Sequence, residues 1–159
     1  MKPLKTNLTE VKKIAEHTRK KVKDMVNESG ENIYKNIKDY ENQINYDLYD
    51  LVEKQTGLKN LTLNMNIIQA GSVGSENKMT TGHSHKFQEE IYLFLKGKGK
   101  MILSYKKNIY KFHVKPNDII SVPAGFWHRV INTGKKKLIF INIFTGKEIP
   151  KSRYSFSRN

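Results

Sequence analysis

The chain has 159 residues, no cysteine and a formal net charge of +14, from 29 lysines and arginines against 15 acidic residues. This length suffices for one domain with a buried core, and the lack of cysteine excludes disulfides and thiolate metal ligands. No apolar run reaches the roughly 18–20 residues of a membrane span, and the amino terminus lacks a secretory signal, so we expect a cytoplasmic protein without a membrane partner. The charge indicates either a lysine-rich solvated surface or an anionic ligand such as a phosphorylated metabolite. Lysine outnumbers arginine, and we expect no nucleic-acid partner.

The beginning of the chain has the spacing of helices. Apolar residues recur every three or four positions between residues 9 and 28, which predicts an amphipathic helix. Similar spacing predicts a second helix over residues 32–53, although residues 33–34 and 48–52 can also pair as strands. We therefore expect residues 1–57 to form an N-terminal helical extension that packs on the rest of the domain.

From Leu61 onward, short alternating runs separated by turn residues predict a β-sandwich or small barrel over residues 58–150. The Gly97-Lys-Gly99 turn predicts a hairpin between the strands on either side of it, and Thr133-Gly134 predicts another. Residues 151–159 form a basic, serine-rich tail. The predicted strands cover residues 61–70, 90–96, 100–105, 109–114, 119–122, 127–132 and 137–144.

Three of the five histidines fall in one pattern. His83 and His85 are separated by one residue, so they project to the same side of a strand. Glu90 follows soon after, and His128 lies far downstream. Three imidazoles and one carboxylate can hold one divalent metal and leave positions open for water or substrate. Glu89 is the alternative carboxylate, and we do not expect the other two histidines, at positions 17 and 113, to be ligands.

These spacings resemble the two motifs of the cupin superfamily. The first motif is matched by His83, His85, Glu90 and Gly97, and the second by Pro123, Gly125, His128 and Asn132. The spacing to Gly97 and the shared strand face with Tyr92 favour Glu90 over Glu89. Asn77 and Asn117 stand where each motif begins with glycine, and asparagine tolerates a left-handed turn well. The resemblance implies a mainly β fold, the cupin double-stranded β-helix (a jelly-roll barrel), preceded by N-terminal helical segments.

Within the superfamily, residues 67–85, 90–99 and 122–134 resemble the archaeal cupin-type phosphoglucose isomerases. The resemblance implies interconversion of glucose 6-phosphate and fructose 6-phosphate by a homodimer with one divalent metal per chain. Fe²⁺ is the first choice, with Mn²⁺, Zn²⁺ or Ni²⁺ as alternatives. It also implies catalytic roles for Glu90 and Tyr92, contacts of Thr80, Gly82 and Tyr92 with the phosphosugar, and metal binding by His83, His85, Glu90 and His128. An enediol route with Glu90 as base and a metal-assisted hydride shift are both compatible with these residues.

The chain departs from this family in the loop between His85 and Glu90, which is two residues shorter, and after the second motif. The strand after the second motif ends at Phe144, where the family usually has a tyrosine, and residues 145–151 lack the family's next histidine. Two other functions therefore stay open on the sequence: a cupin metalloenzyme of another class, such as a dioxygenase or a different sugar isomerase or epimerase, and a non-enzymatic cupin that binds a small molecule.

Overall fold

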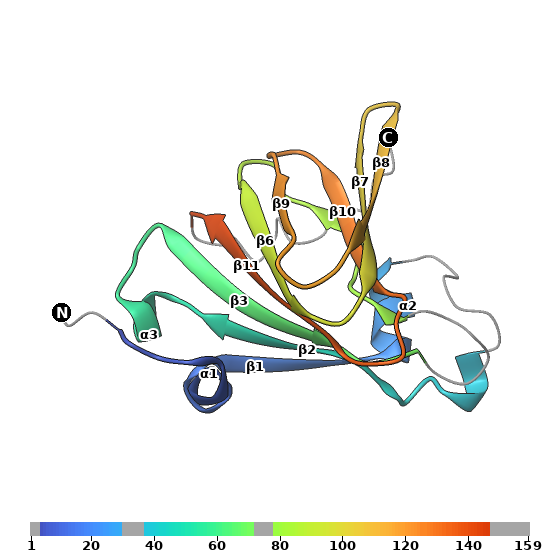
Figure 1. The fold of residues 1–159 in the computed structure, drawn as a ribbon, viewed down its shortest axis with the longest axis horizontal. Helices are drawn as coiled ribbons and strands as arrows, with labels where there is room; N and C mark the ends of the chain where they lie inside the picture. Colours follow the sequence, from blue (N-terminus) through green and yellow to red (C-terminus); the bar gives the residue numbers. More distant parts are fainter. Residues whose placement is uncertain (1–3, 30–36, 72–77, 147–159) are drawn as a thin grey trace.

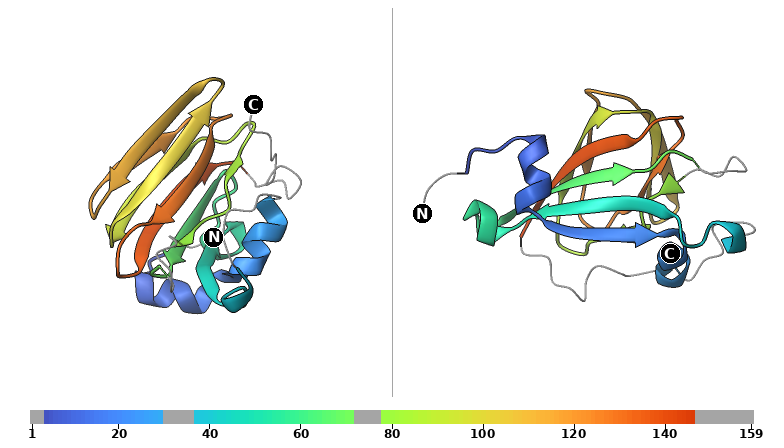
Figure 2. Two further views of the ribbon diagram at one scale, coloured as in Figure 1. Left: turned by 90° about the vertical axis from the view of Figure 1, so that its right-hand side faces the viewer. Right: turned by 90° about the horizontal axis from the view of Figure 1, so that it is seen from below.

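The computed structural model describes residues 4–29, 37–71 and 78–146, which form two antiparallel sheets packed face to face (Figures 1 and 2). In spatial order, the larger sheet contains β1 (Glu16–Lys21), β2 (Ile44–Leu51), β3 (Leu61–Ile68), β11 (Leu138–Thr145), β6 (Glu90–Lys96) and β9 (Ile119–Val122). The smaller sheet contains β4 (Lys78–Met79), β10 (Trp127–Asn132), β7 (Gly99–Tyr105) and β8 (Asn108–Val114), and β5 (His83–Ser84) pairs with β10. The helices are α1 (Leu8–Ile14), α2 (Val22–Ser29) and α3 (Glu53–Thr56), with a 3-10 turn η1 (Ile37–Asp39).

The region after Leu61 folds as the predicted jelly roll. Strands β6, β9 and β10 begin and end at the predicted residues. Asn117 has a φ of 75°, which confirms the left-handed turn expected there. The sheets bury Phe94, Met101 and Phe140 between them, and each such side chain contributes roughly 1.5–3 kcal/mol. Among the described residues, no helix is long and apolar enough to cross a bilayer.

Both predicted hairpins are wrong, because each connection crosses from one sheet to the other. β6 and β11 lie in the larger sheet, whereas β7 and β10 lie in the smaller one. At the first crossing Gly97 has a φ of +89°, and a Cβ there would lie 2.5 Å from the carbonyl oxygen of Lys137. At the second crossing the buried Asn132 amide donates to the carbonyl oxygens of Ile68 and Gln69, at 3.2 and 2.9 Å. Gly97 and Asn132 therefore lie at the two connections that run from one sheet to the other.

The predicted helix over residues 9–28 is wrong as a single element, because the segment divides into α1, β1 and α2. The apolar residues that suggested one continuous face pack in two places. Val11 of α1 packs against the outer face of the larger sheet, and Val22 and Met25 of α2 join the main core. Pairing of β1 with β2 outweighs the local helical spacing of the intervening residues.

The predicted helix over residues 32–53 is also wrong. Residues 44–51 form β2, which lies between β1 and β3. The alternative prediction of a strand at residues 48–52 therefore gave the correct kind of secondary structure. The N-terminal region thus extends the larger sheet, and the domain boundary at residue 57 stays a prediction. Residues 30–36, 72–77 and 147–159, which include Asn77 and the basic tail, lie outside the described residues.

A buried carboxylate on the outer face of the larger sheet ties β1 to β2. Asp47 Oδ1 accepts hydrogen bonds from Arg19 Nε at 2.8 Å and from His17 Nε2 at 2.7 Å. Its Oδ2 accepts from Gln69 Nε2 at 3.4 Å. Burial acts to raise the pKa of Asp47, but the hydrogen bonds from Arg19 and His17 outweigh it and hold the pKa below its usual value. The ionised carboxylate therefore stabilises the fold.

We predict that Asp47→Asn lowers the free energy of unfolding at pH 7 by about 2 kcal/mol, because the amide lacks the negative charge that strengthens both hydrogen bonds. A depressed folded-state pKa gives stability that is present above the unfolded-state pKa and is lost as the pH falls through the folded-state value. The difference between the two proteins should therefore narrow below about pH 4 in urea denaturation. Asp39→Asn, at an exposed position, is the control and should change stability by less than about 0.5 kcal/mol. Equal stability of Asp47→Asn and wild type at pH 7 would contradict the prediction.

Candidate metal centre

The four predicted ligands come from segments that meet in the interior between the sheets. His83 of β5 lies opposite His128 of β10 in the strand register, and Glu90 is the first residue of β6. His85 follows β5, and its carbonyl oxygen accepts a hydrogen bond from the Gly125 N–H at 2.7 Å. Pairing of β5 with β10 therefore brings the two motifs together.

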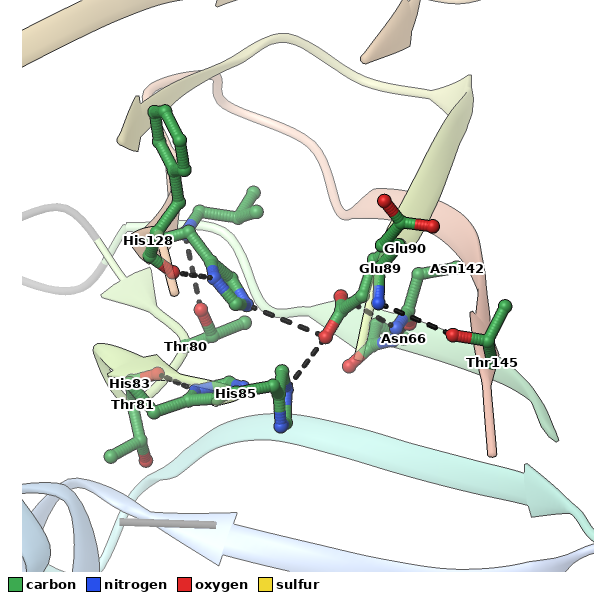
Figure 3. Close-up of polar contacts among 12 residues, drawn as sticks. Asn66, Thr80, Thr81, His83, His85, Glu89, Glu90, His128, Asn142 and Thr145 are labelled. Atoms are coloured by element: carbon green, nitrogen blue, oxygen red, sulfur yellow. Dashed lines mark hydrogen bonds and ion pairs between the residues drawn. The ribbon is translucent and has the colours of Figure 1, made fainter. Parts of the chain in front are cut away.

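The four side chains converge on one point (Figure 3). One ligand atom from each lies within 4.8 Å of every other. The Nε2 atoms of His83 and His85 are 3.0 Å apart, and Glu90 Oε1 lies 2.6 Å from His85 Nε2 and 3.7 Å from His128 Nε2. Metal–ligand bonds of about 2.1 Å place neighbouring ligand atoms roughly 3 Å apart, so these separations fit one shared cation.

Burial keeps imidazoles in this site neutral. It lowers the pKa of His83 to about 3, with further lowering from the nearby His128 and His85, and it also lowers the pKa of His128. Burial acts to raise the pKa of Glu90, but the adjacent histidines lower it below its usual value. Neutral imidazoles beside an ionised carboxylate are the protonation states that bind a metal.

Backbone carbonyl groups orient two of the histidines. His83 Nδ1 lies 2.8 Å from the carbonyl oxygen of Thr81, and His128 Nδ1 lies 3.1 Å from that of Phe126. Each Nδ1–H donates to its carbonyl, which leaves the Nε2 lone pair directed at the centre. This arrangement is the usual second layer of a histidine metal site.

Two asparagines that the sequence reasoning missed orient the carboxylate. Asn142 Nδ2 donates to Glu90 Oε2 at 3.3 Å, and Asn66 Nδ2 donates to Asn142 Oδ1 at 2.9 Å (Figure 3). Both asparagines alternate with apolar residues in their strands, a pattern that normally indicates a solvent-facing polar side. The observation that would have identified Asn142 as a site residue is its position opposite Tyr92 in the register of β11 with β6. This register is known only from the assembled sheet.

The histidine cluster fits a metal on chemical grounds. His128 Nε2 is buried and has no hydrogen-bond partner among the described residues. Such a nitrogen costs free energy unless a ligand engages it. Three imidazole nitrogens and one carboxylate oxygen suit divalent iron, manganese, zinc or nickel.

The remaining candidate ligands lie elsewhere. Glu89 is exposed and its carboxylate points away from the cluster, so Glu90 is the carboxylate beside the histidines (Figure 3). His17 is bonded to Asp47 on the outer face of the larger sheet, and His113 is exposed on β8. Neither approaches the cluster, as the sequence analysis expects.

A cavity beside the cluster contains two of the predicted substrate residues, Thr80 and Tyr92. Tyr92 is 4% exposed, and its ring centre lies 5.9 Å from that of His128. Thr80 Oγ1 accepts a hydrogen bond from the Val130 N–H at 3.1 Å. The lining also includes Thr18, Lys20, Tyr46, Leu48, Asn64, Asn66, Thr81, His83, His85, Glu90, Phe140, Asn142 and Phe144.

Gly82 and Phe144 lie differently relative to the cavity. Gly82 does not line the cavity, and a Cβ there would lie 2.1 Å from the Trp127 ring, so close packing alone requires glycine. Phe144 lies in the cavity wall with its ring stacked 6.1 Å from that of His85. It offers no hydroxyl group to a ligand.

A family model described as glucose-6-phosphate isomerase (GPI) matches residues 19–152. The glucose-6-phosphate isomerase of Thermococcus litoralis is 31% identical over 82% of this chain and 72% of its own length. Those of Pyrococcus horikoshii and Pyrococcus abyssi are 30% and 34% identical, over 72% and 65% of this chain. These two matches span only 61% and 56% of the relatives' own lengths.

Solved structures support the fold. A mutant of Bacillus subtilis oxalate decarboxylase superposes with a TM-score of 0.58 at 20% identity, over 66% of this chain and 27% of that one. A Bacillus halodurans protein superposes with a TM-score of 0.51 at 22% identity, over 58% of this chain and 67% of that one. At such identities the likeness shows the cupin fold alone. Because the family match covers most of the chain, including both histidine motifs, the protein belongs to the cupin-type glucose-6-phosphate isomerase family.

Proposed function

We propose that this protein is a metal-dependent aldose–ketose isomerase that interconverts glucose 6-phosphate and fructose 6-phosphate. The observation that carries the proposal is the convergence of three imidazoles and one carboxylate beside a cavity lined with hydroxyl and amide groups. The substrate is taken from relatives that are named as glucose-6-phosphate isomerases.

One divalent cation per chain would be held by His83, His85, Glu90 and His128, with Fe²⁺ as the first choice and Mn²⁺, Zn²⁺ or Ni²⁺ as alternatives. When bound, the metal supplies Lewis acidity toward the sugar oxygens at C1 and C2. The chain's own contribution is a site in which His83 and His128 are neutral, Glu90 is ionised, and these side chains are already oriented.

Glu90 and Tyr92 are the proposed catalytic residues. In an enediol route, the ionised Glu90 accepts the proton from C2 and returns it to C1, while Asn142 holds its second oxygen in place. In a hydride shift Glu90 acts only as a ligand. Tyr92 faces the cavity beside His128 and would contact the sugar in either route.

Thr80 is the proposed hydroxyl contact for the substrate phosphate. Its Oγ1 already accepts the Val130 N–H, which leaves the hydroxyl proton available to donate into the cavity. The predicted role of Gly82 in substrate binding stays a prediction.

We further propose that the protein forms a homodimer through the outer face of the larger sheet. Ile91, Ile119 and Ile143 are 53%, 67% and 41% exposed on the adjacent strands β6, β9 and β11. A contiguous exposed apolar patch is typical of a subunit interface. The cytoplasmic location and the absence of nucleic-acid and membrane partners stay predictions.

His128→Ala tests the ligand set. Substitution of a residue that hydrogen-bonds to a metal ligand usually lowers metal affinity roughly 10–100-fold. We predict that His128→Ala, which removes a ligand itself, lowers metal affinity by more than this and abolishes turnover. Metal content after dialysis, measured by mass spectrometry, is the readout. His113→Ala is the matched control because it removes an exposed histidine from the same sheet and should retain metal. Full metal retention by His128→Ala would refute the proposed ligands.

Reconstitution tests the activity. We predict that metal-stripped protein reloaded with Fe²⁺, Mn²⁺ or Zn²⁺ converts fructose 6-phosphate to glucose 6-phosphate in a coupled assay, with a kcat on the order of 1–1,000 s⁻¹ for the best metal. Zn²⁺ does not change its oxidation state, so turnover with Zn²⁺ separates isomerisation from oxygen chemistry. No turnover with any metal at confirmed occupancy would sink the proposal.

A further inference from the structure

Strand β1 places a lysine in the cavity wall. Thr18 and Lys20 lie on the inward face of β1, and Lys20 lies opposite Tyr46 of β2 in the strand register. Among the described residues that line the cavity, Lys20 is the only lysine or arginine. Its ammonium group forms an ion pair with the Glu28 carboxylate of α2.

This ion pair is largely removed from solvent, since the side chains of Lys20 and Glu28 are 18% and 24% exposed. Exposed ion pairs add little to stability, and buried ones often fail to recover the cost of desolvation. Stability alone therefore gives little reason to hold a lysine in this wall, and a role in binding is the better explanation.

The pair is connected to the metal site through a single residue. Thr81 Oγ1 donates to Glu28 Oε2 at 3.1 Å, while the Thr81 carbonyl oxygen accepts from His83 Nδ1 at 2.8 Å. The Tyr46 hydroxyl lies 3.5 Å from Thr81 Oγ1. An anion beside Lys20 would therefore meet hydroxyl groups within the same cavity as the histidines.

A phosphorylated sugar needs a positive partner in this cavity. A phosphate carries up to two negative charges, and the ionised Glu90 already contributes one at the metal site. The cavity has a volume of about 70 Å³, whereas ligand pockets measure roughly 300–1,000 Å³. A hexose phosphate thus enters only if wall side chains move, and Lys20 and Glu28 are long side chains that can separate.

We propose that Lys20 is the cation that binds the substrate phosphate, and that the Glu28 carboxylate occupies its ammonium group until the phosphate replaces it. This inference rests on the proposed function for the identity of the sugar. When phosphate binds, the Thr81 hydroxyl either keeps its hydrogen bond to Glu28 or donates to the phosphate instead. The neighbouring Thr80 hydroxyl would contact the same phosphate.

Lys20→Gln should raise the KM for fructose 6-phosphate about 10–100-fold and change kcat by less than about 3-fold, because the lost contact is to the non-reacting phosphate. Lys20→Arg should restore most of the affinity. Lys23→Gln, which removes one charge from an exposed position on α2, should leave the KM unchanged. Melting temperatures check that each variant is folded. An unchanged KM in folded Lys20→Gln overturns the inference.

Inorganic phosphate gives an independent measurement. Glu28→Gln should lower its inhibition constant about 3-fold or more, because the competing carboxylate is neutralised, and Lys20→Gln should raise it. An inhibition constant that neither substitution moves overturns the inference.

Calorimetry separates this inference from the proposed function. Suppose that wild-type protein shows no turnover but binds glucose 6-phosphate more tightly than glucose, and that Lys20→Gln abolishes this preference. The proposed isomerase function would then be wrong, whereas the inference that Lys20 binds phosphate would hold. If wild-type protein binds both sugars equally, Lys20 is not a phosphate site.

Discussion

The buried carboxylate of Glu90 is the constraint on which the rest of the structure depends. An ionised carboxylate that is 3% exposed costs several kcal/mol unless charged or hydrogen-bonding partners surround it. Those partners come from distant parts of the chain: His85 beside β5, His128 on β10 and Asn142 on β11. The packing of the two sheets brings these groups together, and a metal bound there would couple metal affinity to stability.

The same requirement places polar side chains on the inner face of β3 near the site. Asn64 and Asn66 of β3 face the cavity, while Met65 and Ile67 between them face outward and pack against Val11 of α1. On the outer face α1 covers one part, and the isoleucines of β6, β9 and β11 are exposed on another.

The polar groups of the cavity are unevenly distributed. Phe140 and Phe144 of β11 contribute aromatic rings on either side of Asn142, whereas Thr18 and Lys20 of β1 and the segment that carries Thr80 provide hydroxyl and ammonium groups. Under the proposed function, the charged end of the substrate would lie toward β1 and its other end at the histidines. The phenylalanine at position 144, which distinguishes this chain from the tyrosine that the family resemblance implies, is compatible with that division.

The sequence by itself determined which four residues converge in the histidine cluster and most of the strands from Leu61 onward, because period-two alternation, turn residues and motif spacing are local properties of the chain. Only the tertiary structure decided that the turn at Gly97 crosses between sheets, since hairpin and crossover share the same local signal. It also decided that residues 16–21 form a strand, because that strand exists only where β2 is available to pair with it. The positions of Lys20 and Asn142 in the cavity wall were decided by the tertiary structure for the same reason. Whether a polar side chain faces a cavity or solvent depends on which face of its sheet is covered, and that depends on contacts with residues far away in the chain.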